Sequence, residues 1–130
     1  MKPERLVLDT DIVIDLLKKK PTVVSRFLEL IALQTVFLIN PIVIAEVYAG
    51  AFAREYKDIE GFFDLCQRIE TDIDTGRVAG IYANRYSKAF QGISLEDFFL
   101  AATARAHRCP LWTGNNRKHY PMDDIELFAG

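Results

Sequence analysis

Short apolar runs that alternate with helical patterns constrain the fold of this chain more than any other feature of its sequence. The runs Leu6–Leu8 and Val36–Ile39 contain no alternating polar residue, which is typical of strands buried on both faces. A third short strand is expected at Pro110–Thr113 and a weak final one around Ile125–Phe128. Because helical patterns separate the strands, the sequence predicts a three-layer α/β/α sandwich with a short, mainly parallel central sheet.

The helices are predicted from the spacing of their apolar residues and from start and stop signals. A helix is expected over 11–20, and Thr22 is expected to cap a second helix over 22–34. Asn40 and Pro41 form the pattern of an N-cap followed by a proline at the first helical position. Four further helices are predicted over 41–54, 56–69, 75–90 and 95–107.

Length and composition are those of one soluble globular domain. The 130 residues are 50% hydrophobic and 26% charged, which is typical of a single domain. The apolar runs are far shorter than the roughly 20 residues of a membrane span, and a formal net charge of −2 argues against a globally basic nucleic-acid binder. Cys66 and Cys109 lack metal or redox spacing, and Met1–Arg5 has no signal-peptide pattern. We therefore expect a single domain over 1–130, in the cytoplasm, with two small buried cysteines.

Polar residues at the ends of the predicted strands and the starts of helices indicate a site. Asp9 follows the first strand, and Asn115 and Asn116 follow the third, where open parallel sheets bind ligands. Glu46 and Asp97, on helices, are expected at the same edge. Three carboxylates in one cleft repel one another, and an all-oxygen site favours Mg²⁺ or Mn²⁺. We therefore predict a metal site that activates water for attack on a phosphodiester.

Each of the three acids also has a structural interpretation. Asp9 could cap the helix that follows it. Glu46 lies among apolar residues of its helix and could instead form a buried salt bridge to Arg54 or Lys57. The segment Ser94–Asp97 has the pattern of a capping box, which is compatible with metal binding by its acid.

Residues beside these acids are candidates for supporting roles. Thr10 and Thr113 could hold a metal-bound water through their hydroxyls, or could be ordinary turn residues. Asp11 could cap the first helix or supply an oxygen behind the metal ligands. Asp15, one helical turn further on, could pair with a cation.

The loop after the third predicted strand is basic and aromatic. Arg117 and Lys118 could bind nucleic-acid phosphates at the rim of the cleft, although a solvated loop is the simpler interpretation. Tyr120 could stack on a base or pack in the core, and His119 could carry a proton.

Four segments together resemble the PIN-domain family, and within it the VapC-type toxins of toxin–antitoxin pairs. The segments are Leu6–Asp11, Ile44–Val47, Ile93–Ala104 and Leu111–Asn116. They occur in the family's order and span nearly the whole chain, and the third is the most specific of them.

The resemblance implies a Mg²⁺- or Mn²⁺-dependent endoribonuclease with Asp9, Glu46 and Asp97 as acidic ligands. A position that often carries a fourth acid or an asparagine in the family falls on Asn115 or Asn116, neither of which is charged. The resemblance further implies a homodimer, a cognate antitoxin whose C-terminal segment occupies the active-site groove, and tRNA or ribosomal RNA as substrate.

Two other functions are open at this point. The segment Val7–Asp11 resembles the first motif of haloacid dehalogenase-type phosphatases, in which Asp9 would be a covalent nucleophile and Asp11 an acid/base. Asp123 and Asp124 would then be the metal-binding pair. A PIN fold can also serve as a catalytically inactive RNA-binding module.

Overall fold

The computed structural model describes residues 3–129, so residues 1, 2 and 130 of the predicted domain, and part of the N-terminal pattern above, lie outside the described residues. The described residues contain a parallel five-stranded sheet in the order β3-β2-β1-β4-β5. Its strands are β1 (Arg5–Leu8), β2 (Val36–Ile39), β3 (Gln67–Arg68), β4 (Leu111–Trp112) and β5 (Leu127–Phe128).

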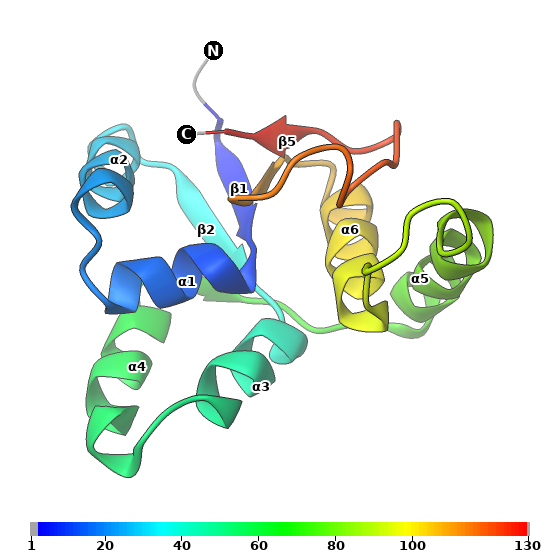
Figure 1. Cartoon of the computed structure of the whole chain (residues 1–130). Helices are drawn as coiled ribbons and strands as arrows, with labels where there is room; N and C mark the ends of the chain where they lie inside the picture. The colour runs from blue at the N-terminus through cyan, green and yellow to red at the C-terminus, as the bar shows by residue number, and fades with distance from the viewer. Residues whose placement is uncertain (1–2, 130) are drawn as a thin grey trace.

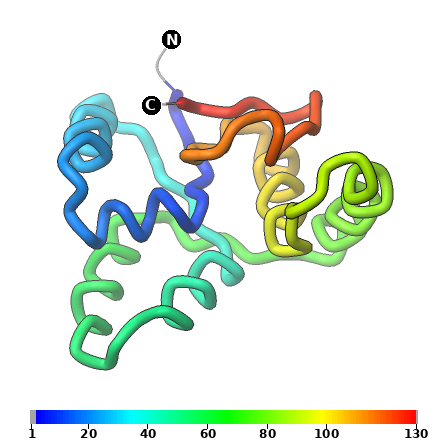
Figure 2. The backbone as a smooth tube through the Cα atoms, viewed as in Figure 1, coloured from blue at the N-terminus to red at the C-terminus, as the bar shows by residue number. Residues whose placement is uncertain are grey.

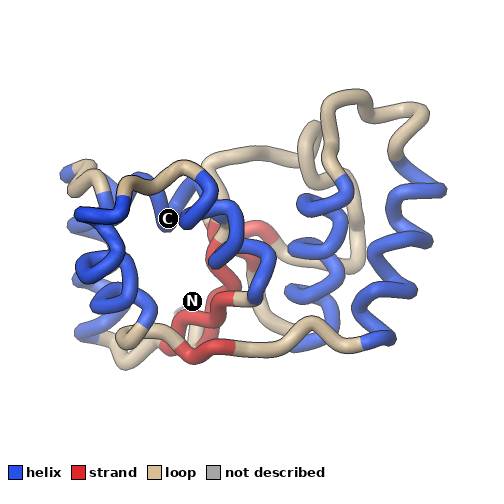
Figure 3. Tube along the Cα trace, turned by 90° about the horizontal axis from the view of Figure 1, so that it is seen from below, coloured by secondary structure: helices blue, strands red, loops and turns tan. Residues whose placement is uncertain are grey.

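Helices cover both faces of this sheet. They are α1 (Thr10–Leu17), α2 (Pro21–Ala32), α3 (Pro41–Ala49), the short 3-10 helix η1 (Ala53–Glu55), α4 (Tyr56–Phe63), α5 (Ile73–Tyr86) and α6 (Leu95–His107). Figure 1 shows α1, α2 and α4 on one side of the strands and α5 and α6 on the other. Figure 3 shows the strands between these two helical groups. The predicted three-layer sandwich with a parallel sheet is confirmed.

The path of the backbone explains why β1 is central. Figure 2 shows the chain running from β1 to one side of the molecule and then crossing to the other side, where it forms α5 and α6 before it reaches β4. Accordingly, β1 pairs with β2 on one edge and with β4 on the other. The sheet order therefore reverses between β1 and β4, and ligands of open α/β sheets bind beyond the carboxyl ends of the strands at such a switch point.

The central strands and the packed faces of the helices form the core. Leu6, Val7 and Leu8 of β1 are fully buried, as the unbroken apolar run predicted. Phe27 of α2 stacks on Phe37 of β2, with ring centroids 4.5 Å apart. Burying side chains of this size stabilises a fold by about 1.5–3 kcal/mol each, so the core holds the strand ends firmly in place.

Two predicted helix ends on the first side are wrong. The helix α2 begins at Pro21, with Lys20 as its N-cap, and Thr22 is not the cap. Proline has a fixed φ and no N–H, so it suits the first helical position. The helix α1 ends at Leu17 and not at residue 20, because the chain turns through a left-handed conformation at Lys19 (φ 59°).

Other predicted helices are displaced or shortened. The helix α3 ends at Ala49, five residues earlier than predicted, and α5 begins at Ile73 after its N-cap Asp72. The helix α4 ends at Phe63, and the chain continues into β3, which the sequence did not predict. This edge strand consists of two exposed polar residues, so it lacks the apolar run that marks β1 and β2. Only α6 has the bounds predicted for it.

The two cysteines are free and half-buried, less enclosed than predicted. Burial raises the pKa of both thiols, that of Cys66 to about 12. None of the described helices is both long and apolar enough to span a membrane.

Candidate active site

The ends of β1 and β4 bring two predicted site residues together. Asp9 follows β1, and its backbone N–H donates to the carbonyl of Trp112 in β4, at 2.9 Å. Thr113 follows β4, and its hydroxyl donates to Asp9 Oδ2 at 2.7 Å. Polar residues that follow β1 and β4 are therefore in direct contact at the switch point of the sheet.

Asp9 is buried, with 6% of its surface exposed. It is the N-cap of α1, and its Oδ1 accepts the backbone N–H of Thr10 at 2.7 Å. Its Oδ2 accepts hydrogen bonds from Thr113 and from the hydroxyl of Tyr120, the latter at 2.9 Å. The capping interpretation of Asp9 is confirmed, and the same carboxylate binds two hydroxyl groups from the segment after β4.

Tyr120 reaches the site from the loop after β4 and is fully buried. Its Oη also lies 3.5 Å from Asp97 Oδ1. Burial raises the pKa of Tyr120 above its usual value, and the charges of Asp9 and Asp97 raise it further. The phenol is therefore a neutral hydrogen-bond donor. Stacking on a base is excluded because the ring is inside the protein, so the alternative prediction of core packing is confirmed.

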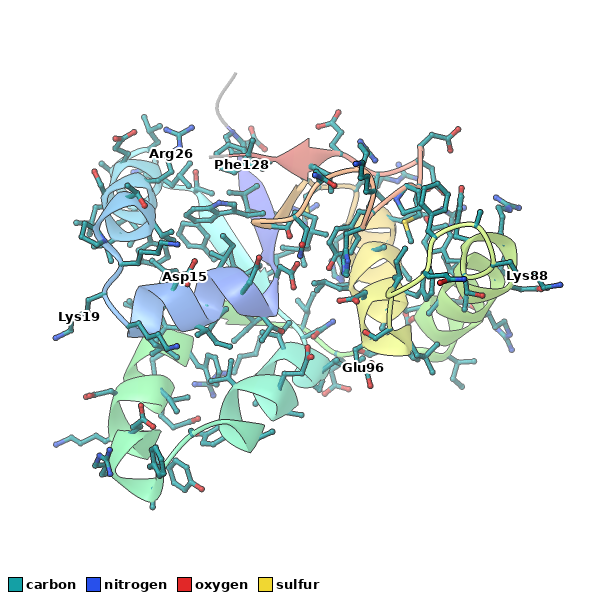
Figure 4. All side chains as sticks on the ribbon, viewed as in Figure 1. Asp15, Lys19, Arg26, Lys88, Glu96 and Phe128 are labelled. Carbon is teal, nitrogen blue, oxygen red and sulfur yellow. The ribbon has the colours of Figure 1, made fainter. Side chains whose placement is uncertain are left out.

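Asp97 is held at the start of α6 by the predicted capping box. Its Oδ2 accepts the backbone N–H of Ser94 at 3.0 Å and the Ser94 hydroxyl at 2.9 Å, while Ser94 Oγ accepts the N–H of Asp97 at 3.2 Å. His119 Nε2 also lies 2.9 Å from Asp97 Oδ2. Glu96, the neighbouring acid, is exposed at the start of α6 (Figure 4).

Glu46 is oriented differently from the prediction. It is exposed, because the buried face of α3 is formed by Val43 and Val47. Its Oε1 accepts the hydroxyl of Thr10 at 2.7 Å, which links it to the residue that follows Asp9. The predicted buried salt bridge is wrong, since the guanidinium of Arg54 lies over an aromatic ring of its own loop.

Asn40 connects the two helices that carry Glu46 and Asp97. It is fully buried and caps α3, accepting the N–H of Val43 at 2.9 Å. Its Nδ2 lies 3.2 Å from Thr103 Oγ1 of α6. The sequence predicted only the cap. The sequence signal that could have indicated the contact with α6 is the position of Asn40. It follows β2 directly, just as Asp9 follows β1.

Asp11 lies in the first turn of α1 and is not the cap. Its Oδ2 accepts the backbone N–H of Gly114 at 2.9 Å, so it fastens the loop after β4. A Cβ at Gly114 would lie 2.7 Å from this oxygen, so the Asp11 carboxylate would have to move to accept any other residue there. Burial and the charge of Asp9 raise the pKa of Asp11 to about 6. Asp15 pairs with Lys20, whose Nζ is 3.7 Å from Asp15 Oδ2, as its cation-pairing interpretation predicted.

The remaining predicted residues belong to the loop after β4. Asn116 Oδ1 accepts the N–H of Lys118 at 2.9 Å, so its amide shapes the turn that leads to Tyr120. The N–H of Asn115 donates to Thr113 Oγ1 at 3.0 Å. Lys118 is exposed.

The prediction for Arg117 is corrected by its contacts. Its guanidinium donates to the backbone carbonyls of Met122 and Ile125, the latter at 2.7 Å. These carbonyls lack partners in a regular ladder, and a fork of N–H donors satisfies both. Arg117 thus fastens the C-terminal segment and is not free to bind phosphate.

The donor set fits a hard divalent cation in its chemistry. Asp9, Asp11, Glu46 and Asp97 supply only oxygen atoms, and such sets favour Mg²⁺ or Mn²⁺. Burial is the main cause that raises the pKa of Asp11 to about 6, and the negative charge of Asp9 adds to it. Within residues 3–129, however, no group of three or more His, Cys, Asp and Glu side chains is gathered closely enough to hold a metal ion. The hydroxyl of Tyr120 lies between Asp9 and Asp97, and the hydroxyl of Thr10 donates to Glu46.

Comparison with known proteins gives the family. Residues 6–123 match the family model of the PIN domain. The chain belongs to the PIN-domain family. Ribonuclease VapC19 of Mycobacterium tuberculosis, in strains CDC 1551 and H37Rv, is 32% identical to this PIN-domain protein over 116 residues, which are 89% of this chain and 92% of the relative.

Solved structures share the PIN fold. The crystal structure of VapBC2 from Rickettsia felis, bound to a DNA fragment from its promoter, has a TM-score of 0.82 at 22% identity, over 95% of this chain and 97% of that chain. DNA-bound VapBC from Salmonella typhimurium has a TM-score of 0.79 at 20% identity, over 95% and 96% of the respective chains. The similarity at these identities establishes the fold alone.

Membership of the PIN-domain family overturns the phosphatase alternative. One member of the metal-binding pair predicted for that alternative, Asp124, is engaged by other side chains. Asp124 Oδ1 accepts the hydroxyl of Tyr82 at 2.7 Å, and Asp124 Oδ2 pairs with Arg105 Nε at 3.0 Å. These contacts fasten the C-terminal segment to α5 and α6.

Proposed function

We propose that this PIN-domain protein is a Mg²⁺- or Mn²⁺-dependent endoribonuclease, the toxin of a VapBC-type toxin–antitoxin pair. The observation that carries the proposal is the contact of one buried hydroxyl with both Asp9 and Asp97, residues far apart in the chain. Two carboxylates this close repel one another, and a divalent cation relieves the repulsion. The name of the relative, a ribonuclease, supports RNA as the substrate class.

The cation would be held by Asp9, Glu46 and Asp97, with Asn115 or Asn116 as a further oxygen donor from the loop after β4. When bound, it would activate a water molecule and neutralise charge on the phosphate. The protein's own residues orient the acids. Thr113 holds Asp9 through Oδ2, and Thr10 holds Glu46 through Oε1. We expect tRNA or ribosomal RNA as substrate.

An antitoxin is the proposed protein partner, supported by the VapBC complexes among the similar structures. A cavity of about 220 Å³ between α1, α3 and α4 offers apolar surface for a partner segment, with Ile14, Val47 and Ile59 in its lining. Exposed apolar residues on α2, including Leu28 and Ile31, are available for a homodimer interface. We place the protein in the cytoplasm, where its RNA substrates are.

The proposal is tested by RNA cleavage with purified protein. Chelation with EDTA should abolish cleavage and excess Mg²⁺ should restore it. Asp9→Asn, Glu46→Gln and Asp97→Asn should each abolish cleavage, because each removes charge and almost no volume. Asp15→Asn is the matched control on α1 and should cleave normally. RNA binding without cleavage by the wild-type protein would instead indicate the catalytically inactive RNA-binding module.

A further inference from the structure

A buried phenol joins two of the proposed metal ligands. Tyr120 is 0% exposed, and its Oη lies 2.9 Å from Asp9 Oδ2 and 3.5 Å from Asp97 Oδ1. A hydroxyl carries one proton, so the short contact is the hydrogen bond, donated to Asp9. The position of the ring is fixed by the turn before it, in which the N–H of Tyr120 donates to the carbonyl of Asn116 at 2.9 Å.

In Asp9 and in Asp97, the two carboxylate oxygens have different hydrogen-bond partners. Asp9 Oδ2 accepts both Thr113 and Tyr120, which occupies the two lone pairs of that atom. Asp9 Oδ1 accepts a single N–H, from Thr10, so it keeps a lone pair for another partner.

The two oxygens of Asp97 also differ in their partners. Its Oδ2 accepts Ser94 and lies 2.9 Å from His119 Nε2, whereas its Oδ1 faces the hydroxyl of Tyr120 at 3.5 Å. The Oδ1 atoms of Asp9 and Asp97 are therefore the oxygens that can accept a further partner. The hydroxyl of Tyr120 lies between the two carboxylates.

We propose that Tyr120 is a positioning residue whose hydroxyl fixes the orientation of the Asp9 carboxylate and so raises the affinity of the site for a divalent cation. The inference rests on the proposed function in one respect, that Asp9 is a metal ligand. Hydrogen-bond partners of metal ligands typically contribute about 10–100-fold to metal affinity, because they hold the ligand in one orientation. A neutral phenol does this without adding charge to a crowded acidic edge.

The test compares two single-oxygen deletions. Tyr120→Phe removes the hydroxyl and keeps the buried ring. Tyr82→Phe is the matched control, because Tyr82 is also buried (3% exposed) and its Oη donates to an aspartate, Asp124, at 2.7 Å. Asp124 is not one of the proposed metal ligands. The probe is Mn²⁺ alone, titrated into each protein without RNA, with free Mn²⁺ measured by electron paramagnetic resonance. Urea unfolding of both variants confirms that they are folded.

We expect Tyr120→Phe to bind Mn²⁺ about tenfold more weakly than the wild type, and Tyr82→Phe to bind it as the wild type does. Unchanged or tighter binding by Tyr120→Phe would overturn the inference and leave the proposed function standing. Equal weakening in both variants would also overturn it, since the effect would then be a general one of lost stability. If the wild type itself does not bind Mn²⁺, the metal dependence of the proposed function fails, and this inference fails with it.

Discussion

The contact between Asn40 and Thr103 predicts a specific loss of stability. Asn40→Ala removes the cap of α3, which costs about 1 kcal/mol. It also removes the buried hydrogen bond from Asn40 Nδ2 to Thr103 Oγ1, and a typical bond of this kind contributes about 1 kcal/mol. Since Asn40 is fully buried, no water replaces either partner, and the two losses sum to about 2 kcal/mol.

Urea unfolding followed by circular dichroism measures this loss. For a protein of this size, with an m-value of about 1–3 kcal/mol/M, the unfolding midpoint should fall by about 1 M. Asp72→Ala is the control, because Asp72 caps α5 through the N–H of Thr75 and is exposed. It should be clearly less destabilising. An Asn40→Ala midpoint equal to that of Asp72→Ala would refute the argument that Asn40 joins α3 to α6.

Three further predictions concern the loop after β4 and a half-buried cysteine. Gly114→Ala would place a Cβ 2.7 Å from Asp11 Oδ2 and so break the bond between them. We expect a loss of about 1–2 kcal/mol in the free energy of unfolding, and wild-type stability would contradict the close approach. Cys66, whose pKa is raised by burial to about 12, should be neutral at pH 8. Iodoacetamide should therefore alkylate it much more slowly in the native protein than in urea, with the rate rising as pH approaches the pKa, and rapid native labelling would be inconsistent with this burial. Arg117→Met removes the donors to two carbonyls in the segment 122–125, so amide hydrogen exchange in that segment should accelerate. Unchanged exchange would show that Arg117 does not hold this segment in place.

The parts of the fold that the sequence predicted are those with strong local signals. The bounds of β2 follow from an unbroken apolar run, and those of α6 follow from the capping box at Ser94–Asp97. The strand β3 has no such signal, because it is a two-residue polar edge strand that exists only by pairing with β2. Where α4 ends was therefore decided by tertiary contact and not by local propensity.

The candidate site was predictable in its positions but not in its contacts. Asp9 was expected from its place after a buried strand, and topology alone brings such positions together. The environment of Glu46 was misjudged, because the buried face of α3 depends on how that helix packs. The role of Tyr120 depends on a contact across 111 residues, which no local pattern indicates. Arg117 looked like a phosphate ligand by charge, but backbone carbonyls bind its guanidinium.

Locating the site at which a divalent cation binds tests the proposed metal ligands most directly. Two-dimensional NMR spectra recorded with small additions of Mn²⁺ would reveal the site through paramagnetic broadening of nearby amide signals. We predict that the signals of Asp9, Glu46 and Asp97 broaden first and together, and that Asp9→Asn removes the effect. Broadening centred on Asp123 and Asp124, or broadening that survives Asp9→Asn unchanged, would contradict the account.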